Sequence, residues 1–169
     1  MQNGNRKRLC LNILVPITIL VIVLGDILTK EWIRSFPPDG ATIVKVWFFR
    51  IIHITNTGSA FGAFQGYSLV LGIIGIIGLF VLSGMGIFIY RKHPRFVNIP
   101  NRIALGLLLG GDLGNLIDRI RFGGQVTDFI DPGFFPVFNV ADSAITIGVI
   151  LVIYTVVREM IRESKINRV

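Results

Sequence analysis

Acidic and amide side chains crowd the stretch between Gly110 and Thr146, although the sequence on both sides of it is strongly apolar. The polar residues of this stretch are Asp112, Asn115, Asp118, Arg119, Asp128, Asp131, Asn139 and Asp142. One carboxylate near the middle of a membrane helix costs roughly 2.5–3.5 kcal/mol on insertion scales. Several carboxylates in one segment must therefore face a protein interior or a wet cavity, where the default interpretation of such groups is functional.

Two aspartates that converge on one water molecule can hydrolyse a peptide bond. Like charges a few ångströms apart cannot both ionise, so the pKa of one carboxyl rises. The ionised carboxylate then acts as base on the water, and the protonated one polarises the scissile carbonyl. Asp128 lies in a strand-like segment (126–129) and Asp142 begins an apolar helix-like segment, so both can point into one pocket. We predict that these two residues form the catalytic pair.

The sequence lacks the residues that other kinds of active site require. It contains no Ser-His-Asp order, no HExxH motif and no phosphate-binding glycine loop with a lysine. The one cysteine, Cys10, cannot form an internal disulfide, and we expect it to be dispensable. His53 and His93 are far apart in the chain, so the sequence predicts neither a metal site nor another cofactor.

Composition indicates a membrane protein. The chain of 169 residues is 52% hydrophobic and 16% charged, with a mean hydropathy of +0.69. A soluble domain is about 45–50% apolar and about 25% charged. The net charge of +7 could suggest nucleic acid as a partner, but the basic residues cluster at the ends of apolar runs, as membrane orientation requires. Residues 1–169 have room for a single domain.

Four apolar segments, at about 9–29, 67–90, 103–120 and 138–157, predict transmembrane helices. The first could instead be a cleaved secretory signal. However, it continues as helix-like sequence past Asp26, which favours a retained helix. Gly106, Gly110 and Gly114 form one smooth stripe for a neighbouring helix. We expect residues 158–169 to be a charged tail.

The segment between the first two helices, about 40–62, is rich in β-branched and aromatic residues and carries too many charges to span a bilayer. It predicts one bent strand or a hairpin outside the membrane, with Trp47 and the phenylalanines at the interface. Asn56 follows the strand-like run 42–55 within this segment, either as a plain turn former or as a functional residue.

The distribution of basic residues predicts the orientation. The side of the membrane that holds both termini has eleven Lys and Arg, and the opposite side has six. The positive-inside rule then places both termini in the cytoplasm and the acidic cluster at the outer face.

Structural roles could also explain the individual acidic residues. Asp142 could cap its helix, and Asp118 could pair with Arg119 or Arg121. Asp26 and Lys30 are four residues apart and can form an ion pair, either solvated at the interface or fixing the helix against the polar pocket.

Five blocks of the sequence resemble, in order, the motifs of one family. These blocks are residues 26–30 (DILTK), 56–61 (NTGSAF), 110–119 (GGDLGNLIDR), 126–129 (VTDF) and 138–144 (FNVADSA). The chain thereby resembles lipoprotein signal peptidase, or signal peptidase II, an integral-membrane aspartyl protease family of bacteria. Asp112 departs from the resemblance, because the family usually has a small neutral residue there.

The resemblance implies that Asp128 and Asp142 are the catalytic aspartates. It implies a supporting or substrate-binding role for Asp26, Lys30, Asn56, Gly58, Asn115, Asp118, Arg119, Asn139 and Ala141. It matches residues 40–62 to an extracytoplasmic β-rich cradle. The implied protein is a multi-pass monomer in the bacterial cytoplasmic membrane, with its site at the extracytoplasmic face, surrounded by lipid. The implied substrate is a prolipoprotein whose cysteine carries diacylglyceryl, cut on the amino side of that cysteine.

Two functions of other classes could explain the same sequence features. A small proton-coupled transporter or relay could use the carboxylates as proton carriers, although an inverted repeat is lacking and the polar groups gather at one face. An assembly factor could use the glycine stripes alone.

Overall fold

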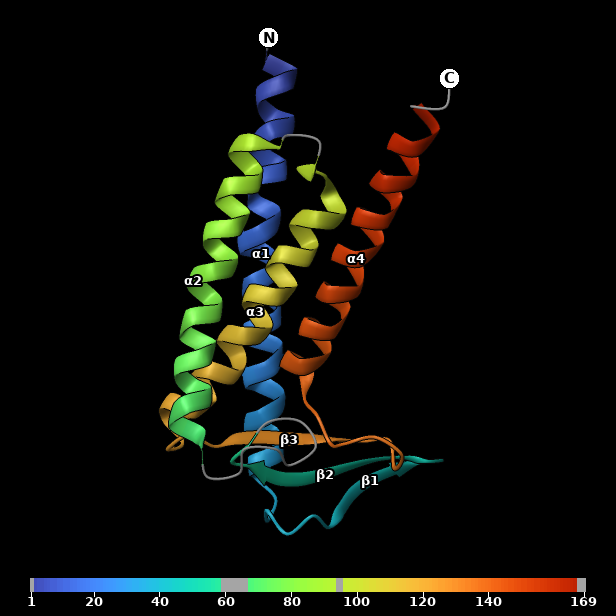
Figure 1. The fold of residues 1–169 in the computed structure, drawn as a ribbon. Coiled ribbons are helices and arrows are strands. Elements are labelled where there is room, and N and C mark those ends of the chain that lie inside the picture. The colour runs from blue at the N-terminus through green and yellow to red at the C-terminus, as the bar shows by residue number, and fades with distance from the viewer. Residues whose placement is uncertain (1, 59–66, 94–95, 167–169) are drawn as a thin grey trace.

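The computed structural model describes residues 2–58, 67–93 and 96–166, with side chains from Ile13 onward. The described part contains four helices and three strands (Figure 1). The helices are α1 (Gln2–Arg34), α2 (Ser68–Lys92), α3 (Ile99–Arg121) and α4 (Val140–Ile166). The strands are β1 (Thr42–Val46), β2 (Phe49–Asn56) and β3 (Val126–Asp131). The prediction of a helical protein with a small β element is confirmed.

The four helices run side by side, and the sheet lies across the end of the bundle opposite the chain termini (Figure 1). α3 contacts each of the other three helices. Its glycines make this possible: a Cβ at Gly110 would lie 3.2 Å from the Cα of Ile19 on α1. A Cβ at Gly111 would lie 2.5 Å from the carbonyl oxygen of Ala141 on α4. The glycine stripe therefore packs against neighbouring helices, as its spacing predicts.

Among the described residues, three helical segments are long and apolar enough to cross a membrane, namely Ile13–Arg34, Ser68–Lys92 and Val140–Ile166. α3 differs from them because polar residues interrupt it and because much of it is buried by the other helices. α2, by contrast, has no buried residue. That α3 also spans the membrane, and that the termini are cytoplasmic, stay predictions.

The sheet is antiparallel, in the order β1-β2-β3. β1 and β2 form a hairpin, which is one of the two forms that the sequence predicted. β3, which lies between α3 and α4 in the chain, pairs with β2, with Asn56 opposite Val126 and Arg50 opposite Asp131. At the hairpin turn Trp47 has a φ of 56° and a side chain that is 85% exposed. The last four residues of the predicted β-rich segment (40–62), residues 59–62, lie outside the described residues.

The helix ends differ from the predictions. α1 continues to Arg34, and α4 continues beyond its predicted end at residue 157 into the charged tail, as far as Ile166. α4 begins at Val140, two residues later than predicted, because Phe138 still belongs to the sheet. Phe138 exchanges two backbone hydrogen bonds with Ile130, at 2.8 and 3.1 Å. This bridge fixes the chain immediately before α4 against β3.

Candidate active site

Asp128 points from β3 into the end of the helix bundle and is 4% exposed. Its Oδ2 accepts a hydrogen bond from the side-chain amide of Asn56 at 2.8 Å, and its Oδ1 accepts one from Asn139 at 2.7 Å. Asn56 lies opposite Val126 in the β2–β3 register, so Asp128 is its diagonal neighbour on the same face. The sheet therefore positions Asp128.

Asp142 lies in the first turn of α4, where it forms a reciprocal cap with Asn139. Asn139 Oδ1 accepts from the backbone N–H of Asp142 at 2.9 Å, and Asp142 Oδ2 accepts from the backbone N–H of Asn139 at 3.2 Å. This exchange is the capping-box pattern. The other carboxylate oxygen, Oδ1, accepts from Asn115 at 2.8 Å. Asp142 thus caps its helix, as one interpretation of the sequence held, and also faces the polar cluster.

Asn139 joins the two aspartates. Its side chain is fully buried, with the amide nitrogen directed to Asp128 and the amide oxygen to the backbone of Asp142. The same amide nitrogen also donates to Asn115 Oδ1 at 3.1 Å. Asp128 and Asp142 are therefore held by one hydrogen-bonded network, although they come from a strand and a helix.

Burial raises the pKa of Asp128 from 3.8 to about 7. Loss of solvation is the main cause, and the negative charge of Asp142 raises the pKa further. The hydrogen bonds from Asn56 and Asn139 act in the opposite direction because they stabilise the ionised form. A carboxyl with this pKa can hold a proton near neutral pH.

Lys30 anchors the network on the side of α1. Its ammonium group is fully buried, 2.7 Å from Asp26 Oδ2 and 3.4 Å from Asp118 Oδ2. It also donates to Asn115 Oδ1 at 3.0 Å. The interpretation of Asp26 and Lys30 as a solvated interfacial pair is wrong, because both side chains have no exposed surface. The pair instead fixes α1 against the polar cluster.

Asp118 binds partners that its sequence neighbourhood does not indicate. Its Oδ1 accepts from Arg34 at 2.6 Å and its Oδ2 from the backbone N–H of Thr127 at 3.1 Å. Arg34 also donates to the Thr127 hydroxyl at 3.0 Å. The alternative interpretation paired Asp118 with Arg119 or Arg121. In the described residues its arginine partner is instead Arg34, and Arg121 binds Glu31 at 2.8 Å.

Arg34 is a residue of the site that the sequence prediction missed. It follows Lys30 by four positions and Asp26 by eight, so all three lie on one face of α1. That spacing could have identified Arg34 as a residue of the site from the sequence. Through Asp118 and Thr127, Arg34 ties α1 and α3 to the strand that carries Asp128.

The remaining predicted site residues have distinct positions. The backbone N–H of Ala141 donates to Asp26 Oδ1 at 2.9 Å. The backbone N–H of Gly58 donates to Asn56 Oδ1 at 2.9 Å, so Asn56 forms a turn and also holds Asp128. Arg119 interacts electrostatically with both Asp142 and Asp128.

Two further aspartates lie apart from the pair. The carboxylate of Asp112 faces α2, where its oxygens would lie 3.1 and 3.0 Å from a Cβ at Gly75 and at Gly78. Asp131 binds Arg50 across the sheet at 2.5 Å. Within residues 2–58, 67–93 and 96–166, no three His, Cys, Asp or Glu side chains are grouped as a metal site would require.

The described part of the chain combines apolar helices with two aspartates that Asn139 bridges, Asp128 buried and Asp142 half-buried. This combination defines a class, the helical membrane proteins with a carboxylate pair at one end of the bundle. Within that class, the family model described as signal peptidase (SPase) II matches residues 18–158. The chain therefore belongs to the signal peptidase II family, and it is a peptidase of the aspartic type.

Individual relatives agree with this assignment. The chain is 45% identical over 136 residues to a lipoprotein signal peptidase of Dehalococcoides mccartyi strain BAV1, covering 79% of this chain and 84% of the relative. It is 39% identical over 138 residues to a lipoprotein signal peptidase of Moorella thermoacetica, covering 78% and 85%. A bacterial membrane enzyme solved by the in meso method at 2.3 Å resolution superposes with a TM-score of 0.76, at 34% identity over 86% of this chain and 88% of that one.

Proposed function

We propose that Asp128 and Asp142 share one proton and activate one water molecule, which cleaves the signal peptide from a lipoprotein precursor. The ionised carboxylate takes a proton from the water as it attacks the scissile carbonyl, and the protonated carboxyl donates to the carbonyl oxygen. The elevated pKa of Asp128, about 7, supports its role as the protonated member near neutral pH.

The observation that most strongly supports this proposal is the set of contacts made by Asn139. A network that binds both carboxylates holds them in a fixed relation while one proton moves between them, and Asn139 contacts both residues. Asn56, Asn115 and the Lys30 cluster support the same geometry from β2, α3 and α1. Arg119 supplies positive charge beside the pair, which supports a role in binding the peptide backbone.

The proposed substrate is a diacylglyceryl-modified prolipoprotein, cut on the amino side of the modified cysteine. The pair lies where the helices meet the sheet, and this placement favours a substrate whose signal helix and acyl chains stay in lipid while the scissile bond reaches water (Figure 1). We further propose that residues 1–169 form one multi-pass domain and act as a monomer in the bacterial cytoplasmic membrane, with the site at the extracytoplasmic face.

Asparagine substitutions test the mechanism. Purified Asp128→Asn and Asp142→Asn proteins should bind a lipidated prolipoprotein in detergent but not cleave it, measured as a mobility shift on a gel. The double variant should be no worse than either single variant, because the two carboxylates act as one unit. Asp131→Asn is the matched control, since Asp131 is equally buried on β3 but binds Arg50.

Substantial turnover by either folded single variant would overturn the assignment of the pair. If the wild-type protein cleaved no lipidated precursor but carried protons across vesicles, the transporter function would replace the peptidase.

A further inference from the structure

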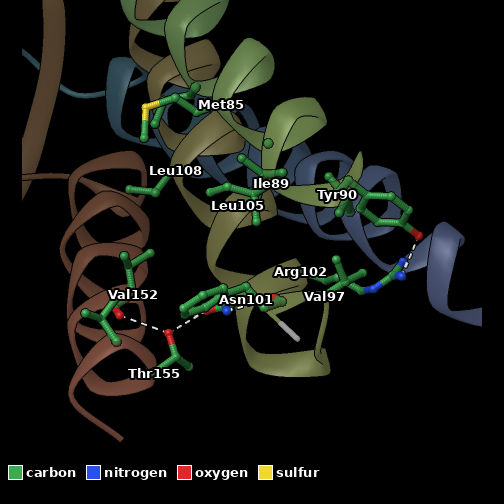
Figure 2. A pocket seen from close by; sticks show the side chains of 15 residues that line it. Met85, Ile89, Tyr90, Val97, Asn101, Arg102, Leu105, Leu108, Val152 and Thr155 are labelled. Atoms are coloured by element: carbon green, nitrogen blue, oxygen red, sulfur yellow. Dashed lines mark hydrogen bonds between the residues drawn. The ribbon is translucent and has the colours of Figure 1, made fainter. Parts of the chain in front are cut away.

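An apolar cavity of about 210 Å³ lies near the end of the bundle that carries the chain termini, far from the aspartate pair (Figures 1 and 2). Met85 and Ile89 of α2, Leu105 and Leu108 of α3 and Val152 of α4 line it. α4 diverges from the other helices toward its C-terminus (Figure 1). The cavity lies among α2, α3 and this part of α4. A cavity of about 150 Å³ already accepts a benzene-sized apolar molecule.

The polar groups of the cavity gather at its terminal end. The Thr155 hydroxyl donates to Asn101 Oδ1 at 2.5 Å, and the guanidinium of Arg102 donates to the Tyr90 hydroxyl (Figure 2). The guanidinium also lies over the Tyr90 ring, 4.7 Å from its centroid. The cavity thus has an apolar body and one polar, cationic end.

Further basic residues are close in the chain to the residues of this end. Arg91 and Lys92 directly follow Tyr90 and are exposed. Arg158 is exposed and lies three residues after Thr155, so it lies on the same face of α4 as that residue. The nearest acidic residue on α4, Glu159, pairs with Arg162 at 3.7 Å. The polar rim is therefore suited to an anion.

We propose that this cavity binds an acyl chain of an anionic phospholipid, whose phosphate lies at the cationic end of the cavity beside Arg102, close to Arg91 and Lys92 at the C-terminal end of α2. An acyl chain supplies dispersion contacts that an empty apolar space lacks. A phosphate at the membrane surface is attracted by clustered Lys and Arg. A signal peptide begins with basic residues, which the same cationic rim would repel, so the charge favours lipid over substrate as the occupant.

Native mass spectrometry of the full chain tests the proposal. In detergent, the protein should retain one phosphatidylglycerol about tenfold more tightly than phosphatidylcholine with the same acyl chains. Val152→Trp adds a bulky side chain to the cavity wall and should weaken phosphatidylglycerol binding about tenfold. Ile153→Trp is the control, because Ile153 is 56% exposed and does not line the cavity. Its phosphatidylglycerol affinity should match the wild type.

A second variant tests the rim without filling the cavity. Arg91→Gln combined with Lys92→Gln should remove most of the preference for phosphatidylglycerol, whereas Arg121→Gln at the opposite end of the bundle should keep it. Equal binding by Val152→Trp and Ile153→Trp would overturn the proposal, and so would equal affinity of the wild type for both lipids. Loss of signal-peptide binding, but not of lipid binding, in Val152→Trp would assign the cavity to the substrate. None of these readouts depends on peptide cleavage.

Discussion

The carboxylate of Asp26 accepts a hydrogen bond at 2.9 Å from the backbone N–H of Ala141, which lies 115 positions later in the chain. The first N–H groups of a helix have no intrahelical partner, and negative charge is favourable beside them. Asp26 on α1 therefore caps α4 next to Asp142. Gly114 leaves space for this contact, since a Cβ there would lie 2.8 Å from Asp26 Oδ2. The position of Asp142 thus depends on α1 as well as on α4.

Removing the cation between Asp26 and Asp118 should destabilise the protein. Lys30→Ala leaves two carboxylates, 0% and 1% exposed, without this counterion. Breaking a buried ion pair in this way costs about 3–5 kcal/mol. We expect the folded yield and the melting temperature in detergent to fall at least as much as turnover per folded molecule.

Arg121→Gln is the matched control for Lys30→Ala. It removes an ion pair with Glu31 whose side chains are 48% and 43% exposed, and such surface pairs contribute about 0–1 kcal/mol. A normal folded yield of Lys30→Ala with abolished turnover would instead place Lys30 among the catalytic groups.

The buried carboxyl of Asp128 should make stability depend on pH. Its pKa in the folded state, about 7, lies above the ordinary 3.8, so the folded protein binds the proton more tightly than the unfolded chain. Stability from this group is therefore lost as pH rises from about 4 to about 7, and the loss stays constant above that range. An asparagine side chain at this position would not titrate.

Comparing Asp128→Asn with the wild type isolates this effect. Between pH 5 and pH 8 the variant should gain about 2–3 kcal/mol of stability relative to the wild type, at roughly 1.36 kcal/mol per pKa unit. Thermal unfolding in detergent at both values measures it. A difference between the two proteins that did not change with pH would show that Asp128 does not titrate in this range.

Peptide cleavage should decrease as pH rises through about 7, because the shared proton is then lost from the pair. It should decrease again in acid, when both carboxyls are protonated. The apparent pKa values belong to the pair rather than to either residue. A rate that was constant from pH 6 to pH 9, measured per folded molecule, would contradict a shared proton.

Asp142→Asn should destabilise α4 in a way that Asp128→Asn does not. It weakens the reciprocal cap with Asn139 and removes negative charge from the helix N-terminus. Loss of a cap costs about 0.5–2 kcal/mol. Hydrogen exchange in the first turn of α4 should increase in Asp142→Asn only. Equal exchange in both variants would indicate that the cap does not depend on the charge.

Reporter fusions test the orientation. A phosphatase that is active only outside the cytoplasm should work when fused after Phe134, in the loop beside the sheet, and fail after Lys92 or at the C-terminus. Phe134 is 81% exposed, so the fusion there leaves the helices intact. Activity of the fusion after Lys92 would reverse the predicted topology.

Much of the fold follows from the sequence because uncharged runs and glycine spacing are local signals. The run before Arg91 predicts α2, and the stripe through Gly110 predicts the close contact of α3 with α1. The start of α4 does not follow from such signals, because a backbone bridge between Phe138 and Ile130 determines it. The helical C-terminal segment was missed because its charges resemble those of a solvated tail.

The residues of the candidate site also fall into two groups, those that the sequence predicts and those that only the structure reveals. Asp128, Asp142 and Asn139 stand out as polar residues in an apolar region, which is why the sequence predicts them as members of the site. The partners of Asp118 do not, since Arg34 and the backbone of Thr127 approach it only after α1 and β3 pack against α3. The double role of Asn56 also required the structure, because the strand register brings its amide to Asp128.

The partners of Asp142 come from segments that are far apart in the chain. Asp26 on α1 caps α4, which is synthesised after α1, α2 and α3, and Asn115 and Asn139 complete the surroundings of the Asp142 carboxylate. During synthesis, a chain that still lacks α4 and the residues just before it has Asp128 but neither Asn139 nor Asp142. On the proposed mechanism, the nascent polypeptide lacks a complete site until α4 has been synthesised. A translation product truncated before α4 should therefore not cleave other membrane proteins.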